Sequence, residues 1–334
     1  MKNSFFRYLV ILVIYTLLSI KSSTRPKPRP NIFESRRNCT SRQRRCFPIV
    51  EPAKCPITIV TAYFDVPSKQ PRDVYVQWMQ NILSIKSCMV IFTNECHMFK
   101  QHASNHRIIL HADLQKEIRV FNQSKQFWKM QIEMDPEKRA HKGYLLYWIW
   151  ALKPTFVSKS AEYGFFNSDY YAWMDIGMFR DSKLNHVNIR TALPPPSFDP
   201  CCIHFGTPFP FEPSDLILNT DGSSIVSFSD QNRVCGCAFL LTKQLASVFQ
   251  EIYFNTFNDY VSHGWFVGKD QTLMNTACVE NTDLFRLIQP NLALGDRWWT
   301  LAYYIFGLMP DTAPVQLHTT TSYSEHLWME AFTF

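Results

Sequence analysis

Apolar runs separated by polar turns predict alternating strands and helices in the first part of the chain. Residues 57–62 form a β-branched run that predicts a buried strand, residues 74–85 carry apolar side chains at helical spacing, and residues 89–92 form a second apolar run. A strand, a helix and a second strand in this order make a βαβ unit with parallel strands. The chain is therefore predicted to begin as an α/β fold.

The same pattern continues through the rest of the chain. It predicts strands at 108–110, 170–174, 235–241 and 285–288, a helical stretch at 114–121, and helices at 124–134, 143–156, 243–258 and 270–278. The helix at 143–156 is expected to end at Lys153 and Pro154, because a proline disfavours helical backbone in the residue before it. The Pro-rich pieces 194–196 and 205–213 are predicted to be long loops and candidate walls of a substrate site.

An acidic residue follows the apolar strand at 170–174 directly. This residue is Asp175, and Gly177 two positions later allows a sharp turn or a close approach of other atoms. Ligands of open α/β sheets bind at the carboxyl ends of the strands. Asp175 is therefore a candidate for contact with a metal ion, a sugar hydroxyl or a phosphate-bound metal. The alternative is that its carboxylate caps the following turn.

Charge is distributed unevenly along the 334 residues, whose formal net charge is +6. Residues 1–54 hold twelve Lys or Arg against two acidic residues, a local charge of +10, which leaves −4 for the remainder. A mildly acidic body offers no general footprint for a phosphate backbone, so no nucleic-acid partner is predicted. The length suffices for one large domain or two closely packed ones.

The N-terminal segment predicts entry into the secretory pathway. Residues 1–21 contain an apolar run that fits a signal peptide or a short signal-anchor, and the two alternatives stay open. Residues 22–54 are basic and Pro/Arg-rich, as in a stem, and residues 55–334 form the predicted globular domain. An uncleaved leader gives a single-pass membrane protein of the Golgi or ER lumen, and a cleaved one gives a secreted protein.

Ten cysteines support an oxidising compartment. They form no paired CxxC frame, so disulfides are predicted rather than a zinc site. Two N-glycosylation acceptors, at Asn38 and Asn122, agree with exposure to a lumen. The chain has no phosphate-binding GxxxxGK[ST], no GxGxxG after a strand, no GxSxG and no HExxH, which removes support for an ATPase, an NAD enzyme, a serine hydrolase or a zincin.

Six short motifs, taken in order, resemble the HtrL/YibB family. They are residues 58–65 (TIVTAYFD), Tyr75 with Trp78, residues 89–92 (MVIF), residues 150–154 (WALKP), residues 173–178 (WMDIGM), and Asp270 with Gln271. The resemblance covers about residues 57–294. That family is grouped with nucleotide-sugar glycosyltransferases of the GT-A type. It implies a GT-A-like α/β fold with a mixed sheet flanked by helices, a nucleotide-sugar donor, and a glycan or glycoprotein acceptor.

The resemblance also implies roles for individual residues. The donor base and ribose would lie beside Thr61, Ala62, Tyr63 and Asn94. Lys153 would lie near the diphosphate, where a cation stabilises the leaving group, although at the end of a predicted helix it equally fits a solvated charge. Asp270 is the candidate catalytic base for the acceptor hydroxyl, and the alternative is a helix N-cap.

The acidic metal motif of GT-A enzymes falls on Asp175, and Gly177 stands where the second acid of an Asp-x-Asp pair is expected. The resemblance therefore implies Mn²⁺ or Mg²⁺ held with the donor through one carboxylate, with Asp181 or His318 as further ligands. His318 equally fits an ordinary structural histidine. An aromatic cluster, Trp148, Trp150, Trp298 and Trp299, fits either a sugar-stacking surface or the core.

Three hypotheses follow. The first is a lumenal glycosyltransferase that uses a nucleotide sugar. The second is a carbohydrate-binding protein without catalysis on the same fold, motivated by the missing second acid. The third is a secreted hydrolase with Asp175 and Asp270 as its carboxylate pair.

Overall fold

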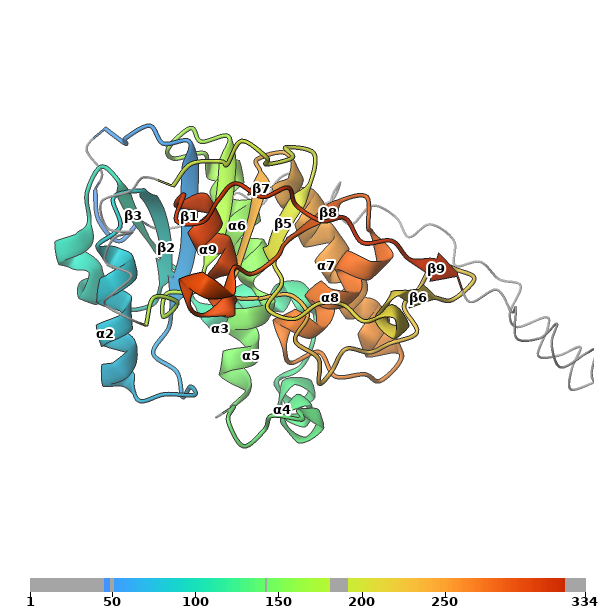
Figure 1. Cartoon of the computed structure of the whole chain (residues 1–334). Coiled ribbons are helices and arrows are strands. Elements are labelled where there is room, and N and C mark those ends of the chain that lie inside the picture. The colour runs from blue at the N-terminus through green and yellow to red at the C-terminus, as the bar shows by residue number, and fades with distance from the viewer. Residues whose placement is uncertain (1–44, 49–50, 142, 181–191, 322–334) are drawn as a thin grey trace, which may run out of the picture. The chain divides into compact units, whose positions relative to one another are not determined.

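The computed structural model describes residues 45–48, 51–141, 143–180 and 192–321, and within them seven strands form one mixed sheet (Figure 1). The strands are β1 (Ile57–Tyr63), β2 (Cys88–Thr93), β3 (Arg107–His111), β4 (Tyr170–Met174), β5 (Ile203–Gly206), β7 (Ala238–Thr242) and β8 (Phe285–Ile288). Their order across the sheet is β3-β2-β1-β4-β7-β5-β8. Strand β7 is antiparallel to both of its neighbours, and the other neighbouring strands pair in parallel.

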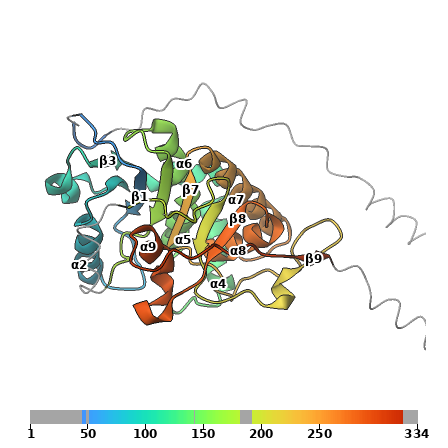
Figure 2. The same ribbon diagram turned by 45° about the horizontal axis from the view of Figure 1, so that its top comes forward.

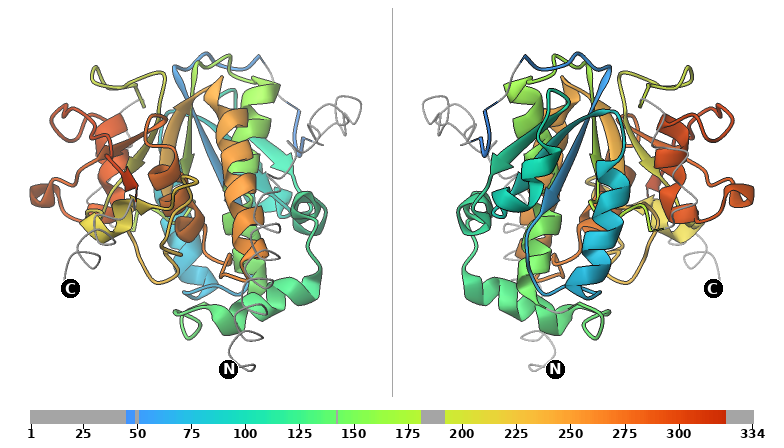
Figure 3. Two further views of the ribbon diagram at one scale, coloured as in Figure 1. Left: turned by 90° about the vertical axis from the view of Figure 1, so that its right-hand side faces the viewer. Right: turned by 90° about the vertical axis from the view of Figure 1, so that its left-hand side faces the viewer.

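Helices cover both faces of the sheet (Figures 1 and 2). One face packs against α5 (Tyr144–Ala151), α6 (Lys153–Tyr163), α7 (Leu245–Ser262) and α8 (Asp270–Glu280), and the other packs against α2 (Arg72–Leu83) and α9 (Thr300–Ile305). Figure 3 shows α6 and α7 side by side on their face. The remaining elements are α3 (Leu114–Glu117), α4 (Lys125–Met134), η2 (Cys96–His102), η3 (Ile118–Phe121), η5 (Pro213–Leu216), η6 (Leu292–Leu294), η7 (Arg297–Trp299), and the paired short strands β6 (Ile217–Leu218) and β9 (Thr320–Thr321).

Strand β1 shows why its sequence is a β-branched run without alternation, since all seven of its residues are buried. Ile57 and Ile59 are buried in the core on the α2 side, and Val60 and Ala62 are buried in the core on the α6 side. A parallel strand covered on both faces needs apolar residues at every position rather than at alternate ones. The structure thus confirms the predicted α/β fold with a mixed sheet flanked by helices.

The predicted strands are present, and four predictions about local structure need correction. The helix expected at 143–156 is two helices, α5 and α6, because Pro154 lies in the first turn of α6, where a missing N–H costs nothing. Strand β5 falls partly inside a segment predicted to be a loop, and α9 was not predicted at all. The strand predicted at 235–241 begins only at Ala238.

The antiparallel strand β7 determines what lies at the ligand-binding edge of the sheet. Because β7 runs against β4, its first residue Ala238 pairs with Met174, the last residue of β4. The backbone N–H of Asp175 then donates to the carbonyl of Cys237 over 2.8 Å. The segment before β7 is therefore held beside the carboxyl end of β4.

Three disulfides occur in the described part of the chain, between Cys46 and Cys96, Cys55 and Cys88, and Cys235 and Cys237. The described part of the predicted stem, residues 45–48 and 51–54, lies along β3, where the N–H of Cys46 donates to the carbonyl of Ile109 over 2.9 Å. No helix in the described ranges is long and apolar enough to cross a membrane. The predicted leader at 1–21, the acceptor Asn38 and the proposed ligand Asp181 lie outside those ranges.

Candidate functional site

A buried lysine joins two carboxylates at the edge of the sheet. The ammonium of Lys153 lies 2.9 Å from Oδ1 of Asp175 and 2.7 Å from Oδ2 of Asp270. It also donates a hydrogen bond of 2.8 Å to the carbonyl of Gly236. The side chain of Lys153 is only 2% exposed, and that of Asp270 is 5% exposed, whereas that of Asp175 is 35% exposed. Asp175 is therefore the member of this group that is most accessible to a ligand.

Each member of the group comes from a different element. Lys153 is the first residue of α6, Asp175 follows β4, and Asp270 is the first residue of α8. Lys153 is not the solvated helix-end charge that its sequence position also allowed. Asp270 is not the N-cap of α8 either, since that position belongs to Lys269, although its Oδ1 accepts from the N–H of Gln271 over 2.9 Å.

Opposing effects act on the ionisation of this group. Desolvation lowers the pKa of Lys153, and the carboxylates of Asp175 and Asp270 reverse this and leave the pKa raised, so the ammonium is retained. Burial raises the pKa of Asp175, while the charge of Lys153 and the hydrogen bonds from Lys153 and Trp173 oppose the rise. The indole N–H of Trp173 donates to Oδ1 of Asp175 over 2.8 Å. That oxygen therefore faces two N–H donors.

Two glycines allow the close packing of this site. A Cβ on Gly236 would lie 2.6 Å from Oδ2 of Asp270, closer than real Cβ contacts allow. A Cβ on Gly177 would lie 3.0 Å from the ring of Tyr75 and 3.4 Å from that of Trp78. Gly177 therefore stands where an Asp-x-Asp motif has its second acid, and aromatic rings fill the space that a side chain there would occupy.

Side chains of α8 hold the segment that contains Gly236. Gln271 donates from Nε2 to the carbonyl of Val234 over 2.7 Å, and Oδ1 of Asn275 accepts from the N–H of Val234 over 2.9 Å. The disulfide between Cys235 and Cys237 closes a small ring around Gly236. The segment that carries the Gly236 carbonyl, the acceptor for Lys153, is therefore held by the side chains of α8 and by the disulfide.

Two cavities meet at Asp175. The larger has a volume of about 560 Å³ and extends along the end of β1 and the start of α2, and the smaller has a volume of about 310 Å³ and contains Lys153 and Asp270. Residues that line both are Tyr75, Leu146, Trp150, Asp175, Arg180, Cys237 and Trp299. Small-molecule sites usually have volumes of roughly 300–1,000 Å³. The joined cavities are large enough for a ligand with two parts, one in each cavity, that meet at Asp175.

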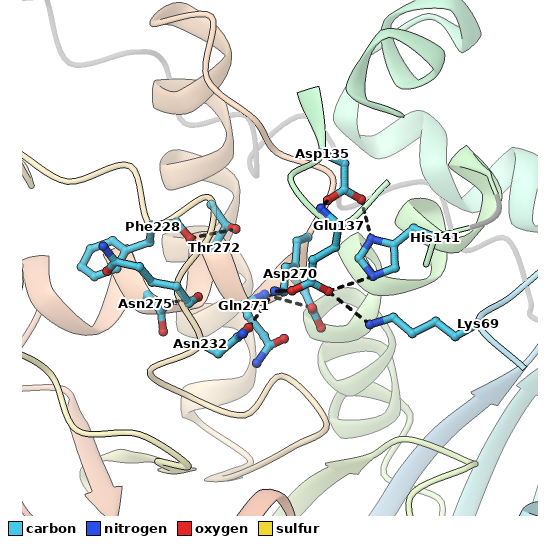
Figure 4. Close-up of polar contacts among 12 residues, drawn as sticks. Lys69, Asp135, Glu137, His141, Phe228, Asn232, Asp270, Gln271, Thr272 and Asn275 are labelled. Carbon is cyan, nitrogen blue, oxygen red and sulfur yellow. Dashed lines mark hydrogen bonds and ion pairs between the residues drawn. The ribbon is translucent and has the colours of Figure 1, made fainter. Parts of the chain in front are cut away.

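The wall of the smaller cavity contains a second charged network (Figure 4). One oxygen of Glu137 lies 2.8 Å from the ammonium of Lys269, and the other lies 3.4 Å from that of Lys69. Lys269 also donates to Oδ1 of Asn232 over 2.6 Å. Lys69 lies between β1 and α2, whereas Lys269 directly precedes Asp270. Glu137 thus connects the segment between β1 and α2 to the residue next to Asp270.

A buried histidine, His141, contacts the carboxylate of Glu137. His141 is fully buried, its Nδ1 pairs with Oδ2 of Asp135, and its Nε2 lies 3.3 Å from Oε2 of Glu137. The hydroxyl of Tyr147 donates to the same oxygen of Asp135 over 2.6 Å. Hydrogen bonding to His141 and the charges of Lys269 and Lys69 hold the pKa of Glu137 well below its usual range.

The donor-site predictions fall in different places. Ala62 and Tyr63 line the larger cavity, and Asn94 lines a neighbouring cavity of about 510 Å³. Thr61 lines neither, because its side chain is fully buried, and within the described residues its hydroxyl has no hydrogen-bond partner. Lys153 lines the smaller cavity.

The aromatic cluster contributes to the cavities as well as to the core. Trp150 and Trp299 line both joined cavities, Trp298 lines the smaller one, and Trp148 lines the neighbouring one. The long loops predicted to form substrate walls, 194–196 and 205–213, line none of these three cavities.

The carboxylates do not form a metal-binding set. The ammonium of Lys153 lies between Asp175 and Asp270, where it pairs with one oxygen of each carboxylate and would repel a second cation placed beside it. In the described ranges, no group of three or more His, Cys, Asp or Glu side chains could hold a metal ion. His318 is exposed next to β9 and lines none of the three cavities. The metal ion implied by the resemblance stays a prediction, and the donor set disfavours it.

Sequence reasoning missed three participants in the site. Gly236 lies between two cysteines, a context that suggested only disulfide bonding, and its closeness to Asp270 depends on the antiparallel β7. Arg180 lies five residues after Asp175 and lines both cavities. Glu137 follows a helix in a polar stretch that has no motif.

Together the sheet and the cleft define the class of protein, an α/β protein whose polar cavities lie at the strand ends where such sheets bind ligands. Residues 55–301 match the family model described as "Bacterial protein of unknown function (HtrL_YibB)". The chain belongs to this family, and the resemblance drawn from its six motifs is confirmed.

No curated protein matches the sequence. Among solved structures, the chain is similar to the crystal structure of mouse xyloside xylosyltransferase 1 in its apo form. The identity is 8%, the match covers 75% of this chain and 93% of that chain, and the TM-score is 0.36.

Proposed function

We propose that the protein is a glycosyltransferase that moves a sugar from a nucleotide-sugar donor to a glycan or glycoprotein acceptor. The observation that carries the proposal is the junction of the two cavities at Asp175. In the proposal the donor nucleotide occupies the larger cavity, the acceptor occupies the smaller one, and the transferred sugar lies between them. The aromatic rings of Trp150 and Trp299, which line both, provide faces on which a sugar can stack.

Asp270 is the proposed catalytic base. A base must lie at the acceptor, and Asp270 lines the smaller cavity, where its carboxylate lies 2.7 Å from the ammonium of Lys153. Lys153 is a positioning residue in this scheme, since it is buried and contacts both carboxylates. Asp175, the more exposed carboxylate, is proposed to contact the sugar at the junction.

The test is transfer by the purified full-length protein, measured as nucleotide release and as acceptor mass, across UDP-, GDP- and CMP-sugars. We expect release with one class of donor and loss of at least about 100-fold in Asp175→Asn, the range seen when a positioned catalytic group is removed. Asp259→Asn is the matched control, because Asp259 lies on α7, is 46% exposed and lines none of the cavities. Equal activity of the Asp175→Asn variant and the wild type would remove Asp175 from the site.

A binding protein without catalysis is the second candidate. It is favoured by one observation, which is that the ammonium of Lys153 contacts both carboxylates of the site. This candidate predicts that the wild-type protein binds glycans with no nucleotide release from any donor. The hydrolase hypothesis loses support for the same reason, because both of its proposed carboxylates, Asp175 and Asp270, are ion-paired with Lys153.

We also propose that the protein functions in the lumen of the secretory pathway, with a leader at 1–21, a stem at 22–54 and the catalytic domain at 55–334. The three disulfides of the described chain support an oxidising compartment. Microscopy of the tagged full-length protein, with protease protection of isolated vesicles, tests a Golgi or ER location. A cytosolic signal would contradict the proposal.

A further inference from the structure

Five basic and five acidic side chains line the joined cavities, and one of the basic ones has no ion-pair partner within the described residues. Lys153 pairs with Asp175 and Asp270, and Lys69 and Lys269 pair with Glu137. Arg72 lies 3.0 Å from Asp65. Of the basic residues that line these cavities, Arg180 alone has no acidic partner within the described residues.

Arg180 is held in place by two aromatic rings. Its guanidinium carbon lies 4.7 Å from the ring centroid of Trp78 and 5.3 Å from that of Trp299. Stacking on indole rings restricts the arginine side chain without using its N–H donors. The guanidinium, at the junction of the cavities, is therefore oriented, and no hydrogen bond or ion pair within the described residues uses its N–H donors.

The side chains at this part of the cavity do not form a donor set for the usual alternative, a divalent cation; within the described residues no group of three or more His, Cys, Asp or Glu could hold one. Asp175 has one oxygen that accepts from Lys153 and Trp173, and the position of the second acid is Gly177. A donor diphosphate would bring two or more negative charges into this cavity. Those charges need a cation other than Lys153, which two carboxylates already neutralise.

We propose that Arg180 forms the subsite for the diphosphate of the donor and takes the place of a divalent cation. The inference rests on the proposed function. It identifies Arg180 as the group that binds the negative charge left on the departing diphosphate. A guanidinium fork binds phosphate oxygens bidentately, which adds orientation to charge. The diphosphate then lies in the larger cavity with the sugar directed to Asp175.

The transfer step balances without a metal ion. The bond between the anomeric carbon and the diphosphate oxygen breaks, and its electron pair stays on that oxygen, next to Arg180. A new bond forms between the anomeric carbon and the acceptor oxygen, whose proton passes to the carboxylate of Asp270. The products are the glycosylated acceptor and a free nucleoside diphosphate.

The experiment is calorimetric titration of the purified full-length protein with UDP, GDP and inorganic pyrophosphate, each with EDTA and with MnCl₂. We expect at least one nucleoside diphosphate to bind in EDTA, with an affinity that changes less than about threefold on adding Mn²⁺. Arg180→Gln should weaken this binding at least about tenfold, as for loss of a hydrogen bond to a charged group, and Arg180→Lys should give an intermediate value. Arg119→Gln is the control, because Arg119 is an exposed arginine that lines none of the cavities.

The outcomes separate this inference from the proposed function. Binding that appears only with Mn²⁺, or that Arg180→Gln leaves unchanged, overturns the inference while a nucleotide-sugar transferase stands. No binding of any of the three ligands under either condition overturns the inference, and the transfer assay with UDP-, GDP- and CMP-sugars decides the proposed function separately. If pyrophosphate binds as tightly as the nucleotides, the protein recognises the diphosphate group itself, which supports Arg180 as the diphosphate subsite.

Discussion

The ammonium of Lys153 lies 2.7 Å from Oδ2 of Asp270, and both side chains are at least 95% buried. The same ammonium contacts Asp175 at the end of β4, so one charge links the start of α6, the start of α8 and the central strand of the site. Removing a partner of a buried ion pair leaves an uncompensated charge, which costs more than the pair itself contributes. This contact is therefore the most sensitive point of the structure.

Replacement of Lys153 by methionine should lower the free energy of unfolding by about 3 kcal/mol, because it leaves two carboxylates without their cation. Chemical denaturation measures the change. Lys159→Met is the matched control on the same helix, since Lys159 pairs with Glu117 but is 30% exposed, and a partly exposed pair contributes at most about 1 kcal/mol. Equal losses in the two variants would contradict the structural role of Lys153.

Replacement of Gly236 by alanine should be destabilising by about 1–3 kcal/mol, because the added methyl meets Oδ2 of Asp270 at 2.6 Å. A double-mutant cycle with Asp270→Ala isolates the clash. The alanine should cost less when Asp270 is already truncated, and a parallel cycle with the distant, exposed Asp259→Ala should show no coupling. Additive effects in both cycles would mean that the two residues do not touch.

The contribution of His141 to stability should depend on pH. Desolvation lowers the pKa of this imidazole, but hydrogen bonds to Asp135 and Glu137 outweigh it, so the pKa in the folded protein is raised above the unfolded value of 6.5. A raised pKa contributes stability that is fully present below the unfolded pKa and is lost as pH rises through the folded pKa. The melting temperature of His141→Gln should therefore fall furthest below that of the wild type near pH 6, and the difference should shrink toward about pH 9. A difference that grows with pH would contradict the assignment.

The disulfides should contribute unequally to stability. Cys55 and Cys88 are 33 residues apart, whereas Cys235 and Cys237 are 2 apart. The chain-entropy model assigns about 4 kcal/mol to the longer loop and about 1.5 kcal/mol to the shorter one. Paired Cys→Ser variants measured by denaturation should follow that order. Loss of transfer activity without a matching loss of stability in the Cys235 and Cys237 variant would locate the role of that bridge in the site.

Asn122 is predicted to carry an N-linked glycan. It is exposed at the end of η3, and the hydroxyl of Ser124, the third residue of its acceptor triplet, accepts from the N–H of Phe127 at the start of α4. Glycosidase treatment of the protein from a secreting cell should increase its mobility, and Asn122→Gln should reduce the shift by one step. This substitution keeps the helix cap, whereas Ser124→Ala would remove it. An unchanged shift would show that Asn122 is not modified.

Local patterns predicted most of the sheet because its strands are buried on both faces. The run 57–62 is apolar apart from the buried Thr58 and Thr61, the run 89–92 is apolar throughout, and β1 and β2 lie where these runs predict them. Strand β5 escaped prediction because its four residues include His204 and Gly206 and lie between Pro-rich segments. The division of the predicted helix 143–156 into α5 and α6 was missed because Pro154 is compatible with both the end and the first turn of a helix.

The sequence by itself determined the α/β class, the family and the position of Asp175 at a strand end, because each depends on residues that are neighbours along the chain. Only the tertiary structure decided the environment of that carboxylate. The antiparallel β7 brings Gly236 beside Asp175, and the start of α8 brings Asp270 to Lys153. These contacts join residues that are tens of positions apart, so the local periodicity of apolar residues does not predict them. The charged side chains buried at these contacts define the candidate site.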